Sequence, residues 1–270
     1  MCISSDSKTR EWTFNTVASA YEKRRPGYVE ELYRTIFAYI PLGEQSNVVE
    51  VGIGGGQATV PILKTGCSLT AVESGPQFSE LLKAKFRDYP RFSVITGKFE
   101  DTELEANAWD LVFSASAFHW IPEKTGYEKV FSMLKSGGAF ARFANHPYRD
   151  KGNPALSKAI DDLYDAYYYK FYNKKRQTLA EFSEEQAKER AMIAYKYGFT
   201  DVKYAMFFRQ RVFSGKEYTE LLGTYSDHIA MEANMRREFF AKIEEAIHQH
   251  GGTVTIYDTI DLQLARKQPC

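Results

Sequence analysis

The chain has 270 residues, a length that suits one large α/β domain or one domain with a cap. Hydrophobic residues make up 44% and charged residues 26%, which excludes an intrinsically disordered protein. Lysine plus arginine and aspartate plus glutamate each number 35, so the formal net charge is zero. The chain therefore lacks the basic field on which non-specific binding to nucleic acid or to anionic membranes relies.

The three cysteines, Cys2, Cys67 and Cys270, have no paired spacing, so the sequence predicts neither a disulfide framework nor a metal site. The first residues are polar and acidic, unlike a signal peptide, and no stretch reaches the ~20 apolar residues of a membrane span. We therefore expect a cytoplasmic protein, monomeric or homodimeric, whose partners include neither nucleic acid nor a membrane.

The N-terminal part, residues 1–46, is predicted to be a helical lead-in. Apolar side chains recur at helical spacing between Phe14 and Tyr21. The segment from Arg25 to Tyr28, which contains Pro and Gly, interrupts this pattern, and a second helix follows and ends at Pro41.

Residues 47–150 alternate short apolar runs with amphipathic stretches. The apolar runs predict strands at residues 47–51, 68–73, 92–96, 109–113 and 139–143, and the stretches between them predict helices at about 57–64, 76–87 and 125–134. Strands that alternate with helices in this way favour a parallel sheet with helices on both faces.

Beyond residue 150 the pattern changes. Residues 151–200 are helix-like and rich in tyrosine, which suits either packing against the sheet or a lid over a ligand. Residues 201–270 predict strands at 202–212 and 253–264 around a helical stretch at about 216–249, and this last pair should include an antiparallel strand. The predicted fold is a doubly wound, mostly parallel seven-stranded α/β sheet of the Rossmann-like kind. The lead-in and residues 151–200 would form a helical cap, and residues 201–270 would complete the sheet.

The most informative segment is the glycine-rich turn that runs from Glu50 through Gly52, Gly54 and Gly56. A strand that leads into glycines and then into a helix lets a ligand approach the backbone and the free N–H groups of the helix start. A phosphate-binding loop would need Lys followed by Ser or Thr at the helix start, and the sequence there is Q-A-T. The dinucleotide fingerprint G-x-G-x-x-G fails as well, because Gln57 stands in place of its third glycine.

Two acidic residues indicate which ligand this turn would bind. Glu50 would repel a pyrophosphate but suits a cationic or amino-bearing ligand. Glu73 ends the next strand, where nucleotide-binding α/β folds place the carboxylate that accepts the ribose hydroxyls, with a merely solvated strand end as the alternative. A ribose and a cationic tail together favour S-adenosylmethionine over NAD.

Further motifs accompany the turn. The segment G-K-F-E-D at residues 97–101 follows the third strand, and the run D-L-V-F-S-A-S-A-F-H-W at residues 110–120 contains the fourth. With these motifs and the opening from Phe14 to Tyr28, the chain resembles the class I S-adenosylmethionine-dependent methyltransferases, in particular their small-molecule "type 11" branch. The resemblance covers residues 12–145 closely. It implies a Rossmann-like methyltransferase fold and S-adenosyl-L-methionine as the cofactor.

The resemblance also implies a role in cofactor binding for each matching residue. Gly52, Gly54 and Gly56 would pass under the methionine and the ribose, and Glu50 would lie near the amino group. Glu73 would accept the ribose hydroxyls, and the backbone of Phe99, with Glu100 beside it, would meet the adenine. Ser114 would lie along the methionine, and Arg25 or Tyr21 would hold the methionine carboxylate. Lys98 departs from the family pattern, since many relatives have an aspartate there that binds the adenine amino group.

The methyl acceptor is expected to be a small organic molecule. The sequence S-A-S-A at residues 114–117 replaces the Asn- or Asp-Pro-Pro-aromatic motif of enzymes that methylate amino groups of bases and glutamine. Resemblance to trans-aconitate-like and related enzymes favours a carboxylate oxygen or an activated carbon as the accepting atom. His119 is the candidate catalytic base, with simple packing beside Trp120 as the alternative. The residues predicted to line the substrate pocket are Trp120, His146, Tyr148, Tyr225 and His228.

Two other functions stay open at this point. A nucleotide-dependent oxidoreductase would need the missing third glycine. A non-catalytic S-adenosylmethionine-binding protein would keep Glu73 and the glycines but would lack a substrate pocket.

Overall fold

The computed structural model describes residues 27–149, 151–176 and 180–268. The chain divides into two compact units. The sheet unit comprises Pro26–His146, Phe182–Phe207 and Ile260–Cys270, and the helical unit includes Pro147–Glu181 and Phe208–Thr259. The domain boundaries expected after residues 46, 150 and 200 stay predictions.

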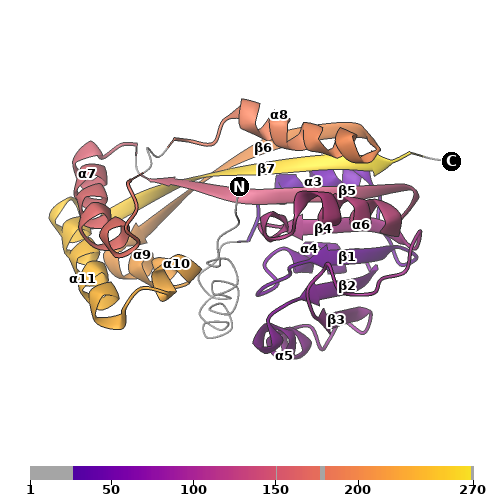
Figure 1. Cartoon of the computed structure of the whole chain (residues 1–270), viewed down its shortest axis with the longest axis horizontal. Coiled ribbons are helices and arrows are strands. Elements are labelled where there is room, and N and C mark those ends of the chain that lie inside the picture. Colours follow the sequence, from indigo (N-terminus) through magenta and orange to yellow (C-terminus); the bar gives the residue numbers. More distant parts are fainter. Residues whose placement is uncertain (1–26, 150, 177–179, 269–270) are drawn as a thin grey trace. The chain divides into compact units, whose positions relative to one another are not determined.

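Seven strands form one sheet in the order β3-β2-β1-β4-β5-β7-β6 (Figure 1). The strands are β1 (Asn47–Val51), β2 (Ser68–Glu73), β3 (Phe92–Thr96), β4 (Trp109–Ala115), β5 (Leu134–Arg149), β6 (Phe199–Ser214) and β7 (Thr253–Lys267). The pairs β1–β2, β1–β4, β2–β3 and β4–β5 are parallel. Parallel neighbours end at the same edge of the sheet, so the turns after β1, β2 and β4 are brought together there.

Strand β7 is antiparallel to both of its neighbours. Arg266, near the end of β7, donates a side-chain hydrogen bond to the carbonyl of Gly137, near the start of β5. Asp261, which comes earlier in β7, contacts His146, near the end of β5. Arg266 also accepts a hydrogen bond at its carbonyl from Thr200, near the start of β6. The prediction of a mostly parallel seven-stranded sheet with an antiparallel strand in the last pair is confirmed.

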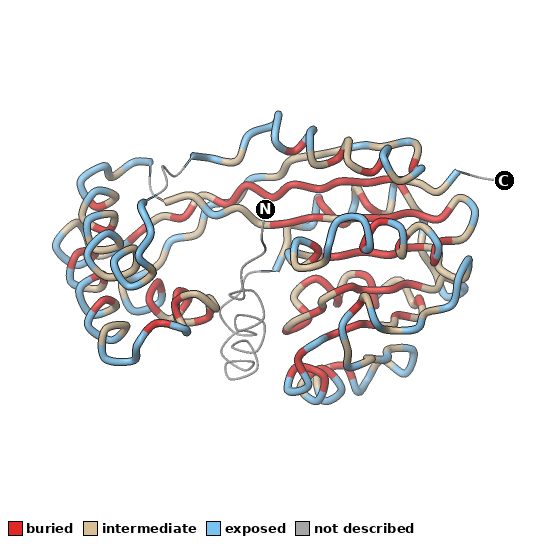
Figure 2. Tube along the Cα trace, in the orientation of Figure 1, coloured by how far each residue is buried: buried red, intermediate tan, exposed pale blue. Residues whose placement is uncertain are grey.

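The central strands are buried on both faces, as a parallel sheet between helices requires (Figure 2). The helices of the sheet unit are α3 (Glu30–Tyr39), α4 (Thr59–Leu63), α5 (Pro76–Lys85), α6 (Glu123–Met133) and α8 (Glu184–Met192), with short 3-10 turns at Phe118–Trp120 and Ile193–Tyr197. Helix α3 forms as predicted because Leu32 and Ile36, one turn apart, are both fully buried. Helix α4 begins two residues later than predicted, since residues 52–57 are used by the turn.

The helical unit contains α7 (Pro154–Leu163), a π-helical turn (Tyr164–Tyr169), α9 (Gly215–Leu222), α10 (Ser226–Ile229) and α11 (Ala233–Gln249). The helical stretch expected at about 216–249 consists of the three helices α9, α10 and α11. Helix α9 ends at Leu222, and the Glu232 side chain caps α11 by accepting hydrogen bonds from the N–H groups of Asn234 and Met235. The tyrosine-rich segment packs on α11, where the Tyr164 ring meets Phe239 edge-on with centroids 5.1 Å apart.

Candidate active site

The glycine turn between β1 and α4 adopts the left-handed backbone that its sequence predicts. Gly52, Gly54 and Gly56 have φ values of 70°, 56° and 73°. A Cβ on Gly52 would lie 2.5 Å from the Cβ of Ala117, and one on Gly56 would lie 2.8 Å from the Phe86 ring. Both the conformation and the space therefore require glycine at these two positions.

Glu73 lies against this turn, at the end of β2. Its carboxylate oxygens accept hydrogen bonds from the N–H groups of Gly54 and Gly75, each at 2.8 Å. Burial raises the pKa of Glu73, and the hydrogen bonds from Gly75, Gly54 and Ser74 oppose that rise. The carboxylate that the sequence assigns to the ribose thus also holds the glycine turn in place.

Glu50 is buried inside β1, with only 1% of its surface exposed. Thr59 donates a hydrogen bond of 2.8 Å to its Oε2, whereas Oε1 is buried and has no hydrogen-bond partner among the described residues. Burial raises the pKa of Glu50 to about 8. A buried acceptor with spare capacity beside a glycine cradle fits a ligand that carries an amino group.

The segment after β3 is held by a lysine that sequence reasoning missed. Phe99 is buried, and Lys129 of α6 donates hydrogen bonds to the carbonyls of Phe99, Glu100 and Thr102. The Lys129 ammonium also lies 4.9 Å from the centre of the Phe99 ring. Lys129 precedes the buried Val130 in α6, and its position in this helix carries no local signal of such a role.

Ser114 and Ser116, at the end of β4, form hydrogen bonds with residues near the glycine turn, with Tyr28 and with β5. Ser114 is buried and donates a hydrogen bond of 2.8 Å to the carbonyl of Val51, just before the glycine turn. The Ser116 hydroxyl lies 2.8 Å from the Tyr28 hydroxyl and accepts a hydrogen bond from the N–H of Asn145. Of the predicted cofactor residues, Tyr21 and Arg25 lie outside the described residues.

His119 and Trp120 follow β4 in a short 3-10 turn, with ring centroids 4.9 Å apart. The His119 side chain is accessible to solvent. Desolvation and the positive charges of Arg142 and Arg190 lower its pKa to about 4, with a further contribution from His146. His119 is therefore neutral at physiological pH and is a weak base.

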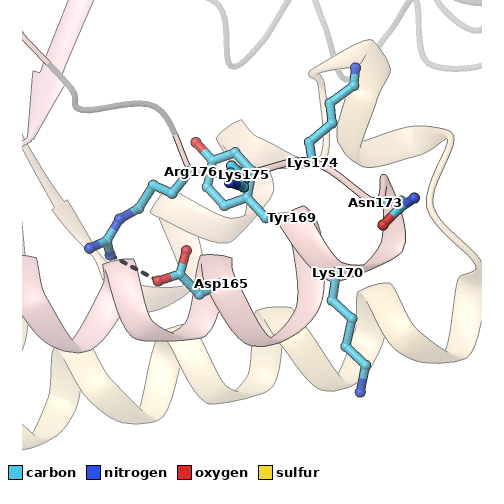
Figure 3. A pocket seen from close by; sticks show the side chains of 7 residues that line it. All are labelled: Asp165, Tyr169, Lys170, Asn173, Lys174, Lys175 and Arg176. Carbon is cyan, nitrogen blue, oxygen red and sulfur yellow. Dashed lines mark ion pairs between the residues drawn. The ribbon is translucent and has the colours of Figure 1, made fainter.

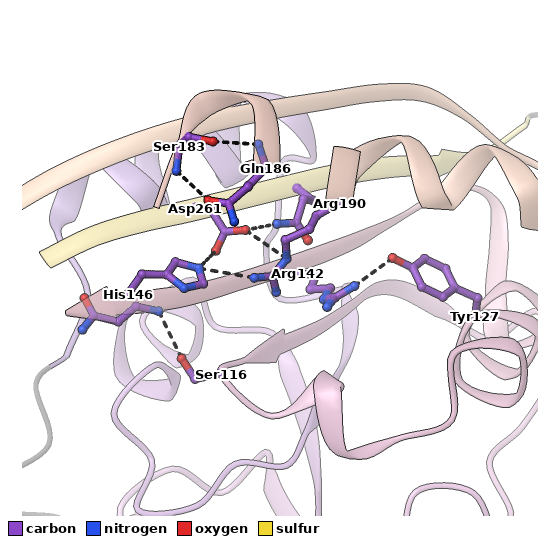
Figure 4. Close-up of polar contacts among 10 residues, drawn as sticks. Ser116, Tyr127, Arg142, His146, Ser183, Gln186, Arg190 and Asp261 are labelled. Carbon is purple, nitrogen blue, oxygen red and sulfur yellow. Dashed lines mark hydrogen bonds and ion pairs between the residues drawn. The ribbon is translucent and has the colours of Figure 1, made fainter. Parts of the chain in front are cut away.

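His146 belongs to a polar cluster of the sheet unit (Figure 4). Its Nε2 lies 2.8 Å from Asp261 Oδ1 and 3.3 Å from an Arg190 nitrogen, and its ring stacks on Phe182 at 3.7 Å. Arg142 joins the same region and donates a hydrogen bond to the Tyr127 hydroxyl. Sequence reasoning missed Arg142, Arg190 and Asp261, which come from β5, α8 and β7.

Tyr148, Tyr225 and His228, also predicted to line the pocket, belong to the helical unit. His228 is buried, and both of its ring nitrogens are engaged, Nδ1 with Asp227 and Nε2 with the Tyr164 hydroxyl, each at 2.9 Å. An open hollow on this unit is lined by other residues, which are Asp165, Tyr169, Lys170, Asn173, Lys174, Lys175 and Arg176 (Figure 3). His228 thus serves the packing of this unit and has no free ring nitrogen.

In residues 27–149, 151–176 and 180–268, no three His, Cys, Asp or Glu side chains are grouped so that they could hold a metal ion. Likewise, none of the helices in the described ranges has the length and apolar character needed to cross a membrane.

Comparison with known proteins places this geometry in a family context. Residues 48–138, from β1 to the start of β5, match the family described as "Methyltransferase domain". The chain is 25% identical to an uncharacterized methyltransferase of Schizosaccharomyces pombe over 87% of both chains. It is 29% identical to an uncharacterized methyltransferase of Mycobacterium tuberculosis, over 47% of this chain and 49% of that protein.

A solved structure agrees with this match in fold. Phosphoethanolamine N-methyltransferase 2 of Haemonchus contortus, determined with S-adenosyl-L-methionine, superposes with a TM-score of 0.55 over 95% of this chain and 57% of that one, at 16% identity. The matched segment contains the glycine turn, Glu50 and Glu73. Residues 48–138 therefore match a methyltransferase domain, and the fold and the geometry of the turn support a class I S-adenosylmethionine-dependent methyltransferase.

Proposed function

We propose that this methyltransferase transfers the methyl group of S-adenosylmethionine to a small organic acid, and that the accepting atom is a carboxylate oxygen. The observation that carries the proposal is the pair of arginines near the end of β4, since Arg142 is paired in register with Ser114 and Arg190 contacts His146. Desolvation and these positive charges also lower the pKa of His119 to about 4, which makes it a poor base. A carboxylate is already ionised at neutral pH and needs no base, whereas a carbon or hydroxyl acceptor must first lose a proton.

The cofactor would be held by the residues that the family resemblance assigns. The glycine turn supplies close backbone approach, Glu50 offers an unused buried oxygen to the amino group, and Glu73 lies beside the turn for the ribose. The backbone of Phe99 with Glu100, and Ser114, would complete the site, with Arg25 or Tyr21 at the cofactor carboxylate. The bound sulfonium supplies the methyl group, and the protein orients the acceptor in line with it and excludes water.

The acceptor would lie beyond the end of β4, near His119, Trp120 and His146. The absence of an Asn- or Asp-Pro-Pro-aromatic motif at residues 114–117 disfavours amino-group acceptors. The missing third glycine leaves the oxidoreductase alternative without support. A cytoplasmic location, a monomeric or homodimeric state and the lack of a nucleic-acid partner stay predictions from the sequence.

The test is a product assay with cofactor labelled in the methyl group. The purified protein is incubated with small carboxylic acids and, as matched controls, with the corresponding primary amides. We expect label in products only from the acids, and we expect mild alkali to release it as methanol, because methyl esters are hydrolysed by base. Label that survives alkali would show a carbon or nitrogen acceptor and would contradict the proposal.

A further inference from the structure

The face of β5 that carries Arg142 adjoins the end of β4. Arg142 is paired in register with Ser114, one residue before β4 ends. Arg190 reaches the same region from α8, and Figure 4 shows it pointing toward His146 while Arg142 points toward Tyr127. Two guanidinium groups from distant parts of the sequence thus lie beside the segment that carries His119.

The positive charge of this cluster is not balanced by the described residues. Arg142 bonds to the neutral Tyr127 hydroxyl and lies 5.5 Å from the centre of the Phe118 ring, and it forms no ion pair with any described carboxylate. Arg190 has Asp261 as its acidic neighbour, with Nε 3.5 Å from Oδ2. That carboxylate is shared with His146 and with the Gln263 amide. The cluster therefore contains two arginines and one aspartate, and that aspartate contacts Arg190 and His146.

Two further observations bear on the binding capacity of the cluster. The Nε of Arg190 is buried and makes no hydrogen bond to any described residue, because Asp261 Oδ2, at 3.5 Å, lies beside it as an ion-pair partner only. Desolvation is the largest cause of the lowered pKa of the neighbouring His119, and the positive charges of Arg142 and Arg190 add to it, so both arginines lie close enough to act on the same site. Uncompensated charge away from water is costly, and an anion that enters the cluster would relieve that cost.

The cluster is also reachable. The Arg190 side chain is 25% exposed, Arg142 is half-buried, and His119 is accessible. A guanidinium offers a planar fork that matches a carboxylate, and partial burial strengthens that contact relative to water. The surroundings therefore suit a small anionic solute.

We propose that Arg142 and Arg190 form an anion subsite that binds a carboxylate of the methyl acceptor and positions it beside His119. This inference rests on the proposed function for the identity of the ligand as the acceptor. The subsite itself rests on the geometry of the two arginines and can be tested without turnover.

The binding test follows the His119 ring resonances by NMR in the full-length protein. Succinate is the probe, and succinamide is the neutral control of matched shape. We expect succinate to shift the His119 resonance in a saturable way and to raise its pKa, because the added negative charge favours the imidazolium. Succinamide should leave the resonance unchanged. Equal shifts with both compounds, or no shift with succinate, would overturn the subsite.

Variants assign the effect to these two side chains. R142Q and R190Q should each weaken succinate binding by about tenfold or more, since each removes charge-assisted hydrogen bonds. R142K keeps the positive charge but loses the forked donor geometry of the guanidinium, so its succinate affinity should lie between that of R142Q and that of the wild type. Thermal unfolding and the cofactor affinity of each variant verify that it is folded. Unchanged succinate affinity in a folded R142Q/R190Q double variant would overturn the assignment.

Arg209 provides the matched control. Arg209 pairs with the fully buried Asp258, and its side chain is 23% exposed. Arg190 is similar, since its side chain is 25% exposed and lies beside the fully buried Asp261. Arg209, however, belongs to the helical unit. R209Q should leave succinate binding unchanged. An R209Q variant that loses binding as strongly as R190Q would show a non-specific charge effect and would also contradict the proposal.

Kinetics then separate this inference from the proposed function. With an acid that the product assay identifies as an acceptor, R142Q and R190Q should raise KM by about tenfold or more and change kcat less. If the product is an alkali-labile ester but neither variant changes KM, the subsite fails and the proposed function stands. If the label is stable to alkali while the arginines still bind succinate, the proposed function fails and the subsite stands.

Discussion

At the scale of single residues, the glycine turn is flanked by two buried carboxyl groups with different hydrogen-bond partners. Glu73 accepts hydrogen bonds from two backbone N–H groups of neighbouring turns, which favour its ionised form. Glu50 accepts one hydrogen bond from Thr59 and is otherwise enclosed in the strand β1. The two carboxylates therefore make different contributions to stability and to ligand binding.

Replacing Glu73 with alanine should weaken S-adenosylmethionine binding by tenfold or more. A hydrogen bond to a charged acceptor contributes roughly 1.5–3 kcal/mol, and about 1.4 kcal/mol corresponds to a factor of ten in affinity. Calorimetric titration measures the effect. Glu80→Ala is the control, since Glu80 is exposed on α5 and pairs with the exposed Lys83. Unchanged cofactor affinity in Glu73→Ala would show that the ribose assignment is wrong.

Replacing Glu50 with glutamine should change how stability depends on pH. The pKa of Glu50 is raised from its usual 4.5 to about 8 in the folded protein, so the folded state binds more protons than the unfolded state between these values. The contribution of Glu50 to stability is therefore lost as pH rises from about 4.5 to about 8, with a steepest slope of ~1.4 kcal/mol per pH unit.

Glu50→Gln removes this titration, so the stability of the variant relative to the wild type should increase from pH 5 to pH 8. Urea unfolding at several pH values measures the difference. A difference that stays constant over this range would contradict the raised pKa of Glu50.

At the scale of elements, the glycine turn depends on the elements that pack around it. The space for a side chain at Gly52 is occupied by Ala117, which follows β4. The space at Gly56 is occupied by the ring of Phe86, which follows α5. The turn is therefore built by a short sequence motif but is enclosed by neighbouring strands and helices.

Gly52→Ala should lower stability more than an alanine at another glycine with the same backbone. The left-handed conformation costs a non-glycine residue ~1–2 kcal/mol, and forcing a methyl group into an occupied space adds roughly 1–3 kcal/mol. Gly137→Ala isolates the first cost, because Gly137 has φ 79° and nothing within 4 Å of its added Cβ. Differential scanning calorimetry compares the two variants, and equal losses would show that the contact with Ala117 is readily relieved.

At the scale of the whole molecule, three strands supply residues to both compact units. Residues of β5, β6 and β7 are divided between the sheet unit and the helical unit. The sheet unit nevertheless has its own core, which includes Val49, Val112, Val130, Phe140 and Phe199. All five of these core residues lie after residue 46.

Removal of residues 1–26 should therefore abolish methyl transfer and weaken cofactor binding while the sheet stays folded. The resemblance assigns Tyr21 and Arg25 in this segment to the cofactor, and we predict that the lead-in and the helices beyond residue 150 cap the site and keep water from the sulfonium. Tyr28 is retained because its ring packs edge-on against Phe143 with centroids 4.8 Å apart. Circular dichroism verifies folding, and a truncated protein that methylates at the full rate would contradict the cap.

The sequence by itself determined the elements and motifs whose information is local. The strands predicted at residues 47–51, 68–73 and 92–96 have the same bounds in the structure, because a short apolar run between turn signals is sufficient to specify a buried strand. The glycine turn was equally predictable, since the left-handed backbone strongly favours glycine.

Only the tertiary structure decided the features that depend on partners far apart in the sequence. Strand β5 begins at Leu134 rather than at residue 139 because a bulge lets Leu134 pair with Trp109 before Ala139 pairs with Leu111. The cluster of Arg142, His146, Arg190 and Asp261 is assembled from β5, α8 and β7, and no periodicity within one segment indicates that these side chains meet. The lowered pKa of His119 is a property of the folded sheet as well, because it arises from desolvation and from the charges of Arg142 and Arg190.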